Sequence, residues 1–162
     1  MAKRWWIWLL ALAGTAQASA AQRVDLVRVD KSERTLWLMR GDAVVARFPV
    51  ALGGNPVGHK QREGDRRTPE GRYVLDFRKR DSAFFRAIHV SYPNADDRAR
   101  AKRAGVPPGG AIMIHGQPNG LGALAAVTQR RDWTDGCIAL SNADMQRVWD
   151  LVRVPVPIEI VP

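Results

Sequence analysis

Apolar and polar side chains alternate at every second position in parts of this chain, and that pattern limits the fold more than any other feature. In the run 44–52 the even positions are all apolar, while the odd positions include Arg47 and Pro49. Successive side chains of a β-strand point to opposite faces, so a period of two is typical of a half-buried strand. Pro49 cannot donate a hydrogen bond to a neighbouring strand, so we expect this run at a sheet edge or beside a bulge.

Similar short runs, separated by turn residues, predict a mainly β protein. Thr68–Gly71 has proline second and glycine fourth, which suits a tight turn before one of these runs. The expected strands lie around residues 24–26, 35–39, 44–52, 72–77, 87–92, 111–114 and 158–161.

Two helices are expected beside the strands. Ser141 followed by Asp144 has the form of a capping box, and apolar residues recur at helical spacing between 145 and 152. The segment 96–104 is polar and rich in Arg and Ala, which predicts a short exposed helix. Together these elements predict a single domain with a β-sandwich or barrel-like core, one C-terminal helix and a minor helix.

The first twenty residues have the composition of a secretory signal peptide. A positively charged start precedes a short apolar run, Trp5–Ala13, and a small-residue cleavage site, Ala18–Ala20. The apolar run is about half of the ~20 residues that a membrane-spanning helix needs, so no stable membrane span is expected. We assign 1–20 to a signal peptide and 21–162 to one domain.

The chain is basic, with a formal net charge of +9. This charge fits either a soluble basic surface or attraction to an anionic polymer. Export and the lack of aromatic residues among the basic ones oppose nucleic acid as the partner. Peptidoglycan peptides and acidic lipid headgroups fit better.

Cys137 is the single cysteine, so it cannot form an internal disulfide. It follows Thr134, Asp135 and Gly136 and precedes an apolar strand, an arrangement that can present a thiol at the end of a rigid element. Gly136 allows the backbone amides of Gly136 and Cys137 to approach a substrate carbonyl, as in an oxyanion hole. Burial of the thiol as a small apolar group is the alternative.

A cysteine nucleophile needs a base, and the chain offers three histidines. His115 ends an expected buried strand and precedes Gly116, so it is the candidate base. His59 lies in a polar loop, where a solvated role is expected, whereas His89 lies inside an expected strand, where it would pack or hydrogen-bond. A zinc site is a further alternative, but His59, His115 and Cys137 lack the close spacing of paired zinc ligands.

Two motifs, Ile114–Gly116 and Thr134–Cys137, resemble the signature of the L,D-transpeptidase catalytic domain, also called the YkuD-type domain. Gly64–Tyr73 and Ser91–Asp97 resemble further elements of that family, the second of them an element of its periplasmic murein-processing branch. The resemblance spans residues 24–161. It implies a β-rich domain in the periplasm that acts on peptidoglycan stem peptides, with no cofactor and no metal.

The resemblance also implies roles for individual residues. Cys137 would be the acylated nucleophile, and His115 would take and return its proton. The carbonyl of Gly116 would orient the imidazole. The backbone of Asp135 and Gly136, with that of the nucleophile, would form the oxyanion hole.

Two departures from the family's pattern bear on the site. Asp135 stands where the family often has His; a carboxylate facing the thiol would raise the pKa of Cys137, so we expect this side chain to point away. Ala139 stands where many members carry Arg, which removes a contact to a substrate carboxylate and favours the murein-processing branch. Thr134 is expected to shape the loop.

Substrate contacts and the reaction type remain open. Arg130 and Arg131, between the two motifs, are candidates to bind a stem-peptide carboxylate, and Tyr92 is a further candidate for substrate binding. An amine acceptor would make the enzyme a transpeptidase, whereas water would make it a carboxypeptidase or an amidase that releases a wall-linked lipoprotein. A wall-binding domain without catalysis is the alternative from a different class.

Overall fold

The computed structural model describes residues 23–162, and the expected signal peptide lies outside the described residues. The elements, in chain order, are β1 Leu26–Asp30, β2 Thr35–Arg40, β3 Ala43–Pro49, β4 Gly71–Lys79, β5 Ala87–Val90, α1 Ala95–Ala104, β6 Met113–His115, the 3₁₀ helix η2 Gly122–Leu124, α2 Ala125–Thr128, β7 Ile138–Ala139, α3 Asn142–Leu151 and β8 Val156–Val161.

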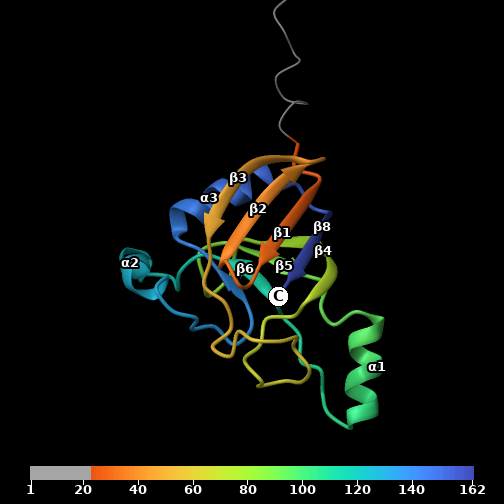
Figure 1. Ribbon diagram of the computed structural model, residues 1–162. Helices are drawn as coiled ribbons and strands as arrows, with labels where there is room; N and C mark the ends of the chain where they lie inside the picture. The colour runs from red at the N-terminus through yellow and green to blue at the C-terminus, as the bar shows by residue number, and fades with distance from the viewer. Residues whose placement is uncertain (1–22) are drawn as a thin grey trace, which may run out of the picture.

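All eight strands belong to one sheet, in the order β3-β2-β1-β8-β4-β5-β6-β7 (Figure 1). β1 pairs in parallel with β8, and β6 with β7, whereas the other neighbours are antiparallel. Ala51, just after β3, exchanges backbone hydrogen bonds of 2.9 and 2.8 Å with Ala139 in β7. These bonds join the two edges of the sheet, so it curls into a closed body. The prediction of a mainly β, barrel-like fold is confirmed.

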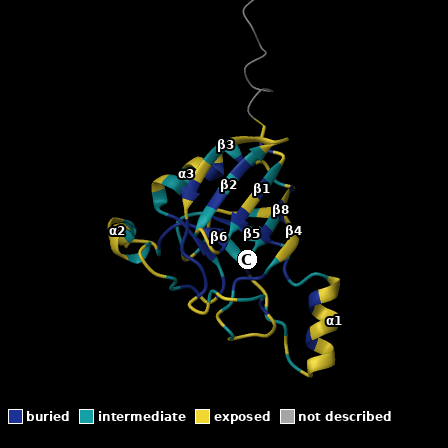
Figure 2. Cartoon of the chain, viewed as in Figure 1, coloured by how far each residue is buried: buried dark blue, intermediate teal, exposed yellow. Residues whose placement is uncertain are grey.

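The core lies inside the curled sheet and under α3 (Figure 2). Met145, Val148 and Trp149 of α3 are buried, as their helical spacing predicts. Ser141 begins this helix, because its hydroxyl accepts a 3.1 Å hydrogen bond from the N–H of Asp144. The predicted C-terminal helix is confirmed.

The edge position predicted from Pro49 is also observed. β3 is the first strand of the sheet, and its pairing with β2 is irregular between Leu38 and Met39. The tight turn expected at Thr68–Gly71 is wrong: residues 68–70 form no turn, and the carbonyl of Thr68 accepts instead from Lys31 Nζ. The N–H of Glu70 likewise bonds to a side chain, Nδ1 of His59, so tertiary contacts replace those of a turn.

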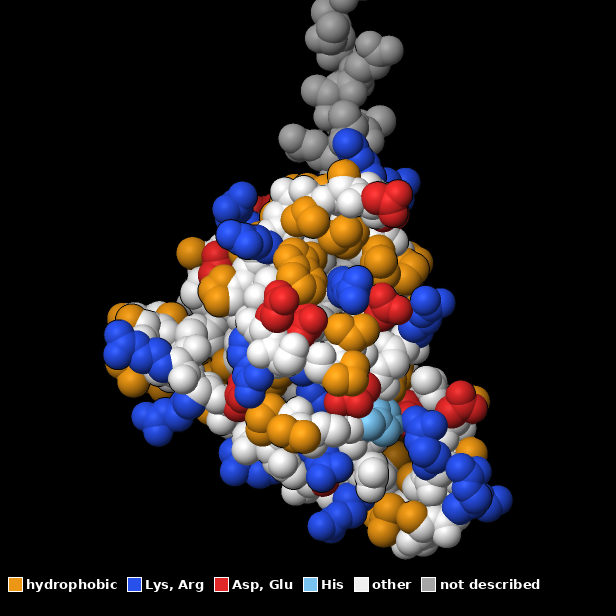
Figure 3. Space-filling model, viewed as in Figure 1, with side chains coloured by type: hydrophobic (Ala, Val, Ile, Leu, Met, Phe, Trp, Pro, Cys, Tyr) orange, Lys and Arg blue, Asp and Glu red, His pale blue; other side chains and the backbone are white. Residues whose placement is uncertain are grey.

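Helix α1 stands away from the sheet (Figure 1) and carries exposed basic side chains (Figure 3). Asn94 and Asp97 form a capping box at its start. Asp97 itself is buried, so the predicted exposed helix has one anchored face. Within residues 23–162, no helix is long and apolar enough to cross a membrane.

Candidate active site

Strands β6 and β7 bring together the two segments that carry Cys137 and His115. The strands pair in parallel, with His115 opposite Ala139. Cys137 directly precedes β7, and its Sγ accepts a 3.4 Å hydrogen bond from the N–H of Met113 at the start of β6. Residues two apart on a strand face the same side, so Cys137 and His115 occupy diagonal positions on one face of this strand pair.

The His115 imidazole is buried and held in one orientation. It is 2% exposed, and its Nδ1 lies 2.6 Å from the carbonyl oxygen of Gly116. A carbonyl oxygen only accepts hydrogen bonds, so in the neutral ring Nδ1 carries the proton and Nε2 keeps its lone pair. Burial lowers the pKa of His115, and the Gly116 hydrogen bond opposes this only in part. The imidazole is therefore a neutral base at neutral pH.

Two aromatic side chains enclose this imidazole. The rings of Phe84 and Trp133 lie 4.1 and 5.9 Å from the His115 ring, measured between centroids. The backbone of Gly116 is also tightly enclosed. A Cβ added there would lie 2.6 Å from the side-chain oxygen of Asn142 and 2.9 Å from the carbonyl oxygen of Phe85. A side chain at position 116 would displace the carbonyl that orients the imidazole.

The Cys137 thiol is half-buried and protonated at rest. Its Sγ lies 3.7 Å from the carbonyl oxygen of Ala111, to which it donates. Burial raises the pKa of the thiol, and the charge of Asp135 raises it further, whereas the N–H of Met113 and the charge of Lys60 lower it. Since the thiol is the resting form, attack on a substrate needs a base to remove its proton.

Thr134 fixes the loop before the cysteine. Its buried hydroxyl donates a 2.7 Å hydrogen bond to the carbonyl of Cys137 and accepts a 3.1 Å bond from the N–H of Gly136. The expected oxyanion hole therefore changes, because the Gly136 amide is already used. Within the described chain, the amide of Cys137 donates no hydrogen bond, which leaves it free for a substrate oxygen.

Position 136 requires glycine, because a residue with a side chain does not fit there. Its φ is +131°, and an added Cβ would lie 2.6 Å from the carbonyl oxygen of Arg67. The cysteine loop thus packs directly on the backbone of the segment before β4. The sequence motif places a glycine here, but the partner in this contact was not predicted.

That segment supplies charged residues that sequence reasoning missed. Lys60 is 3% exposed and its Nζ lies 2.8 Å from Asp65 Oδ1. Arg66 Nε lies 3.4 Å from Asp135 Oδ1, and the Asp135 side chain is exposed as expected, although its charge still raises the pKa of Cys137. The signal that could have pointed to these residues is the position of Gly64–Tyr73 among the family-like motifs.

A hollow of about 410 Å³ opens beside this segment; we call it the Arg66 hollow. Its lining residues are Lys60, Glu63, Gly64, Arg66, Gly109, Gly110 and Asp135.

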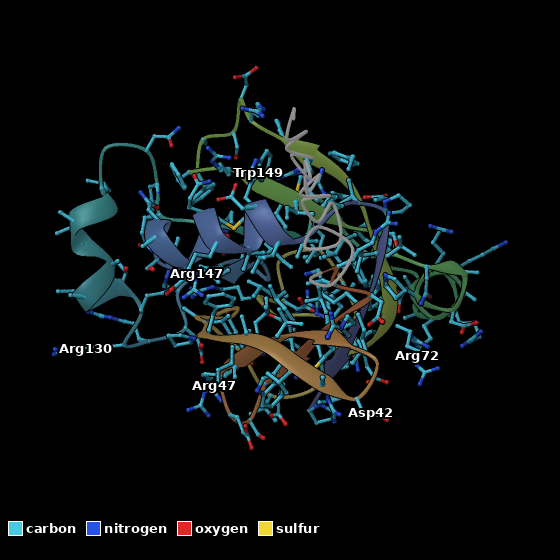
Figure 4. The ribbon with its side chains drawn as sticks, turned by 90° about the horizontal axis from the view of Figure 1, so that it is seen from above. Asp42, Arg47, Arg72, Arg130, Arg147 and Trp149 are labelled. Carbon is cyan, nitrogen blue, oxygen red and sulfur yellow. The ribbon has the colours of Figure 1, made fainter. Side chains whose placement is uncertain are left out.

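Three candidate substrate-binding residues lie elsewhere. Tyr92 is 3% exposed, and its hydroxyl donates to the carbonyl of Pro108, so it is a core residue and its burial does not fit the expected substrate contact. Arg130 follows α2 and points away from the body of the molecule (Figure 4). Arg131 beside it is exposed. No contact of these two arginines with Cys137 or His115 is found among the described residues.

The other histidines have structural partners. The solvated role expected for His59 is wrong: Nδ1 accepts from the N–H of Glu70 at 2.9 Å, and Nε2 lies 3.0 Å from Asp97 Oδ1. His89 packs and hydrogen-bonds as expected, stacked on Phe77 with Nδ1 2.7 Å from Asp76 Oδ1. In the part of the chain that the structure describes, no three His, Cys, Asp or Glu side chains are grouped to hold a metal ion.

The fold and the two motifs define the class of this protein. It belongs to the YkuD family, the L,D-transpeptidase catalytic domain, which matches residues 25–160. YafK of Escherichia coli (strain K12) is 32% identical over 112 residues, which are 65% of this chain and 44% of that protein.

Solved structures share the fold. The helical cell shape determining protein Pgp2 from Campylobacter jejuni has a TM-score of 0.66 and 26% identity, over 85% of this chain and 47% of that chain. Bd1075 of Bdellovibrio bacteriovorus has a TM-score of 0.58 and 25% identity, over 88% and 49%. The chain thus spans about half the length of these relatives.

Proposed function

We propose that this protein is a peptidoglycan-modifying cysteine acyltransferase, in which Cys137 forms a thioester with a stem peptide. The observation that carries the proposal is the parallel register of β6 and β7, which sets Cys137 and His115 at diagonal positions on one face. Membership of the L,D-transpeptidase family supports the reaction class.

The reaction follows from the protonation states of the two side chains. The Nε2 atom of His115 accepts the thiol proton while Sγ of Cys137 attacks the carbonyl carbon of the scissile amide. The C–N bond then breaks, and the imidazolium returns its proton to the departing amine, which leaves a thioester. An acceptor amine attacks this thioester and its proton passes to Nε2. The C–S bond then breaks as Nε2 gives that proton to the departing sulfur, which restores the thiol.

The backbone stabilises the negative charge that develops on the substrate oxygen. The N–H of Cys137 is the free donor closest in sequence to the attacking sulfur, and the N–H of Asp135 is proposed as its partner. One such donor typically contributes about 2.7–4 kcal/mol to transition-state stabilisation.

A hydrolase acting on the same bonds is the second candidate. Ala139 favours a hydrolase, because it stands where many family members carry Arg and this difference fits the murein-processing branch. Water would then resolve the thioester, and a wall-linked lipoprotein could be the group released.

The cellular setting is part of the proposal. An N-terminal signal peptide, 1–20, would deliver the domain 21–162 to the periplasm, where peptidoglycan lies. Pgp2 is named as a determinant of helical cell shape, so we extend the proposal to wall remodelling that affects cell shape.

Mass spectrometry of the protein with imipenem tests the nucleophile, because LdtMt1, an LD transpeptidase of this fold, has been solved in complex with that compound. We expect a covalent adduct on Cys137 that the Cys137→Ala protein lacks. Digestion of muropeptides with and without an added amine then separates the reaction types, since only a transferase gives an amine-dependent product. Unchanged wall binding and wall phenotype in Cys137→Ala, with no muropeptide product, would instead favour the non-catalytic domain.

A further inference from the structure

Arginine side chains gather over Trp149, which lies near the C-terminal end of α3 (Figure 4). The guanidinium carbons of Arg78, Arg86 and Arg80 lie 3.8, 5.0 and 5.7 Å from the centroid of its ring. Arg153 belongs to the same group, because its charge acts on the guanidinium of Arg78. We call these four arginines the Arg78 cluster. The end of β4, the residue before β5 and the segment after α3 thus bring their positive charges to one place.

The positive charge of the Arg78 cluster is not balanced by the residues that the structure describes. None of the four guanidinium groups forms a salt bridge with them. Asp150 is an acid that acts on Arg78, but both of its carboxylate oxygens already accept hydrogen bonds of 2.9 Å from the amide of Gln146. Burial lowers the pKa of Arg78, and the charges of the other three arginines lower it further. Because like charges held together repel one another, an anion bound among them would relieve this repulsion.

Arg78 anchors the cluster on the helix. Its guanidinium covers the indole of Trp149 and donates to the carbonyl of the same residue, in the last turn of α3. These contacts suit a cation at the C-terminal end of a helix, and they explain Arg78 itself. They do not explain why Arg80 and Arg153, both exposed, gather at the same place. The Nε of Arg78 is also buried without a hydrogen-bond partner among the described residues. The cluster therefore holds more charge and more donors than the packing of α3 requires.

Arg86 reaches the cluster from a backbone conformation that favours glycine. Its φ is +49°, in the left-handed region that residues with a side chain rarely adopt. Such a conformation costs stability, and residues held in it are concentrated at functional sites. A glycine would relieve the strain but would remove one guanidinium from the face of Trp149. The conformation therefore supports a function for the arginine side chain.

We propose that the Arg78 cluster is a binding site for a phosphate monoester, carried either by a lipid head group or by a soluble molecule. A carboxylate has one charge and two oxygens, which match one guanidinium. A phosphate monoester has nearly two charges and three terminal oxygens, so it can engage several guanidiniums, each of which pairs with two oxygens. Arg80 and Arg153, the exposed members, are open to such a ligand. No residue of the cluster takes part in the proposed acyl transfer, so the site is independent of that proposal.

Binding of the full chain to two forms of one head group tests the site and distinguishes its sources. Glycerol phosphate is the soluble form, measured by calorimetry, and phosphatidic acid in phosphatidylcholine vesicles is the lipid form, measured by sedimentation. Vesicles of phosphatidylcholine alone correct for contacts of the N-terminal residues with lipid. We expect phosphate-dependent binding by the wild type, and binding about 25-fold weaker by Arg80→Gln/Arg153→Gln. This is about fivefold for each arginine, from about 1 kcal/mol per basic residue at an anionic surface.

A matched variant separates the cluster from the overall charge of the protein. Arg40→Gln/Arg47→Gln removes two exposed arginines from β2 and β3 and leaves the same net charge as the cluster variant. It should bind as the wild type does. Cys137→Ala should also bind as the wild type does, so failure of acyl transfer and failure of this site are distinguishable.

The outcomes decide between the sources and against the site. Binding to phosphatidic acid vesicles alone supports a lipid head group as the ligand, whereas binding to glycerol phosphate supports a soluble one. Succinate, a dicarboxylate of similar charge, should bind more weakly than glycerol phosphate wherever glycerol phosphate binds. No phosphate-dependent binding by the wild type, or an equal loss in Arg40→Gln/Arg47→Gln, would overturn the inference.

Discussion

Thr134 and Cys137 are joined by a 2.7 Å hydrogen bond from the Thr134 hydroxyl to the Cys137 carbonyl oxygen. The same hydroxyl accepts the N–H of Gly136, so one buried oxygen fixes both residues of the turn that presents the thiol. The small hydroxyl residue of the motif is thus a support for the nucleophile's backbone.

Replacing this hydroxyl by a methyl group tests that role. Thr134→Val leaves a buried amide and a carbonyl without their partner, which costs about 1–3 kcal/mol for each unsatisfied group. We expect a lower free energy of unfolding and a slower acylation of Cys137 by imipenem. Urea denaturation and time-resolved mass spectrometry measure the two effects. Thr134→Ser keeps the hydroxyl and should restore both; equal rates for the valine and serine proteins would contradict the assigned role.

Alkylation of Cys137 should depend on pH in a way that reports its surroundings. Burial raises the pKa of this thiol, so less thiolate is present at neutral pH than for a free cysteine. The rate with iodoacetamide should therefore rise with pH to a midpoint above that of a free thiol, ~8.5. Asp135→Asn removes a negative charge and should shift the midpoint downward.

The control for this shift is Asp42→Asn, which removes the same charge at a distant turn. Its alkylation profile should overlay that of the wild type. A midpoint at or below that of a free thiol in the wild-type protein would contradict the protonated resting state.

Asp65 should stabilise the segment beside the site in a pH-dependent way. Burial opposes its ionisation, but hydrogen bonds from Lys60 and from the N–H groups of Gln61, Arg67 and Arg62 prevail and lower its pKa from 3.8 to about 2. The folded-state pKa is depressed, so the stabilisation is present above pH 3.8 and is lost as pH falls toward 2.

Asp65→Asn should lower the free energy of unfolding at pH 7 by roughly 2 kcal/mol, from about 1.4 kcal/mol per pKa unit. Urea denaturation at pH 7 and at acid pH measures this, and the difference from wild type should shrink as the pH approaches 2. A difference that is the same at both pH values would mean that the carboxylate charge is not responsible.

Gly136 should tolerate no side chain. The φ of +131° and the 2.6 Å approach of an added Cβ to the Arg67 carbonyl both oppose alanine. Strain of this kind costs about 1–3 kcal/mol, and the backbone shift that relieves it would move the thiol. We expect Gly136→Ala to lose most of its acylation by imipenem. Gly120→Ala is the control, since its φ is +83° but nothing lies within 4 Å of the added Cβ; a similar loss there would exclude the close contact as the cause.

The elements that the sequence predicts well are those in which apolar side chains recur at a regular spacing. The run 44–52 and the buried stripe of α3 show their burial in the sequence itself. Helix α2 was missed because no side chain in it is buried, so it leaves no stripe to detect. The turn expected at Thr68–Gly71 is not formed because the Thr68 carbonyl and the Glu70 N–H bond to side chains that are distant in the sequence.

Residues of the candidate site were likewise predicted where a local motif marks them and missed where only the tertiary fold brings them together. Cys137 and His115 were found from local motifs that carry their own glycines. The environment of His59 was not predicted, because its partner Asp97 is 38 residues away and is brought close only by the tertiary fold. The Arg66–Asp135 pair was missed for the same reason, since contacts between loops have no period.

The hydrogen bonds that join the two sheet edges also hold the strand that follows the nucleophile. β7 has only two residues, yet Ala139 is bonded to Ala51 on one side, and on the other the N–H of Leu140 donates to the carbonyl of His115 at 2.8 Å. Release of so short a segment requires opening of the barrel itself, the part of a protein that exchanges its amide hydrogens most slowly. The mostly exposed part of the spacer, residues 119–127, can therefore change in length or move without releasing the sulfur.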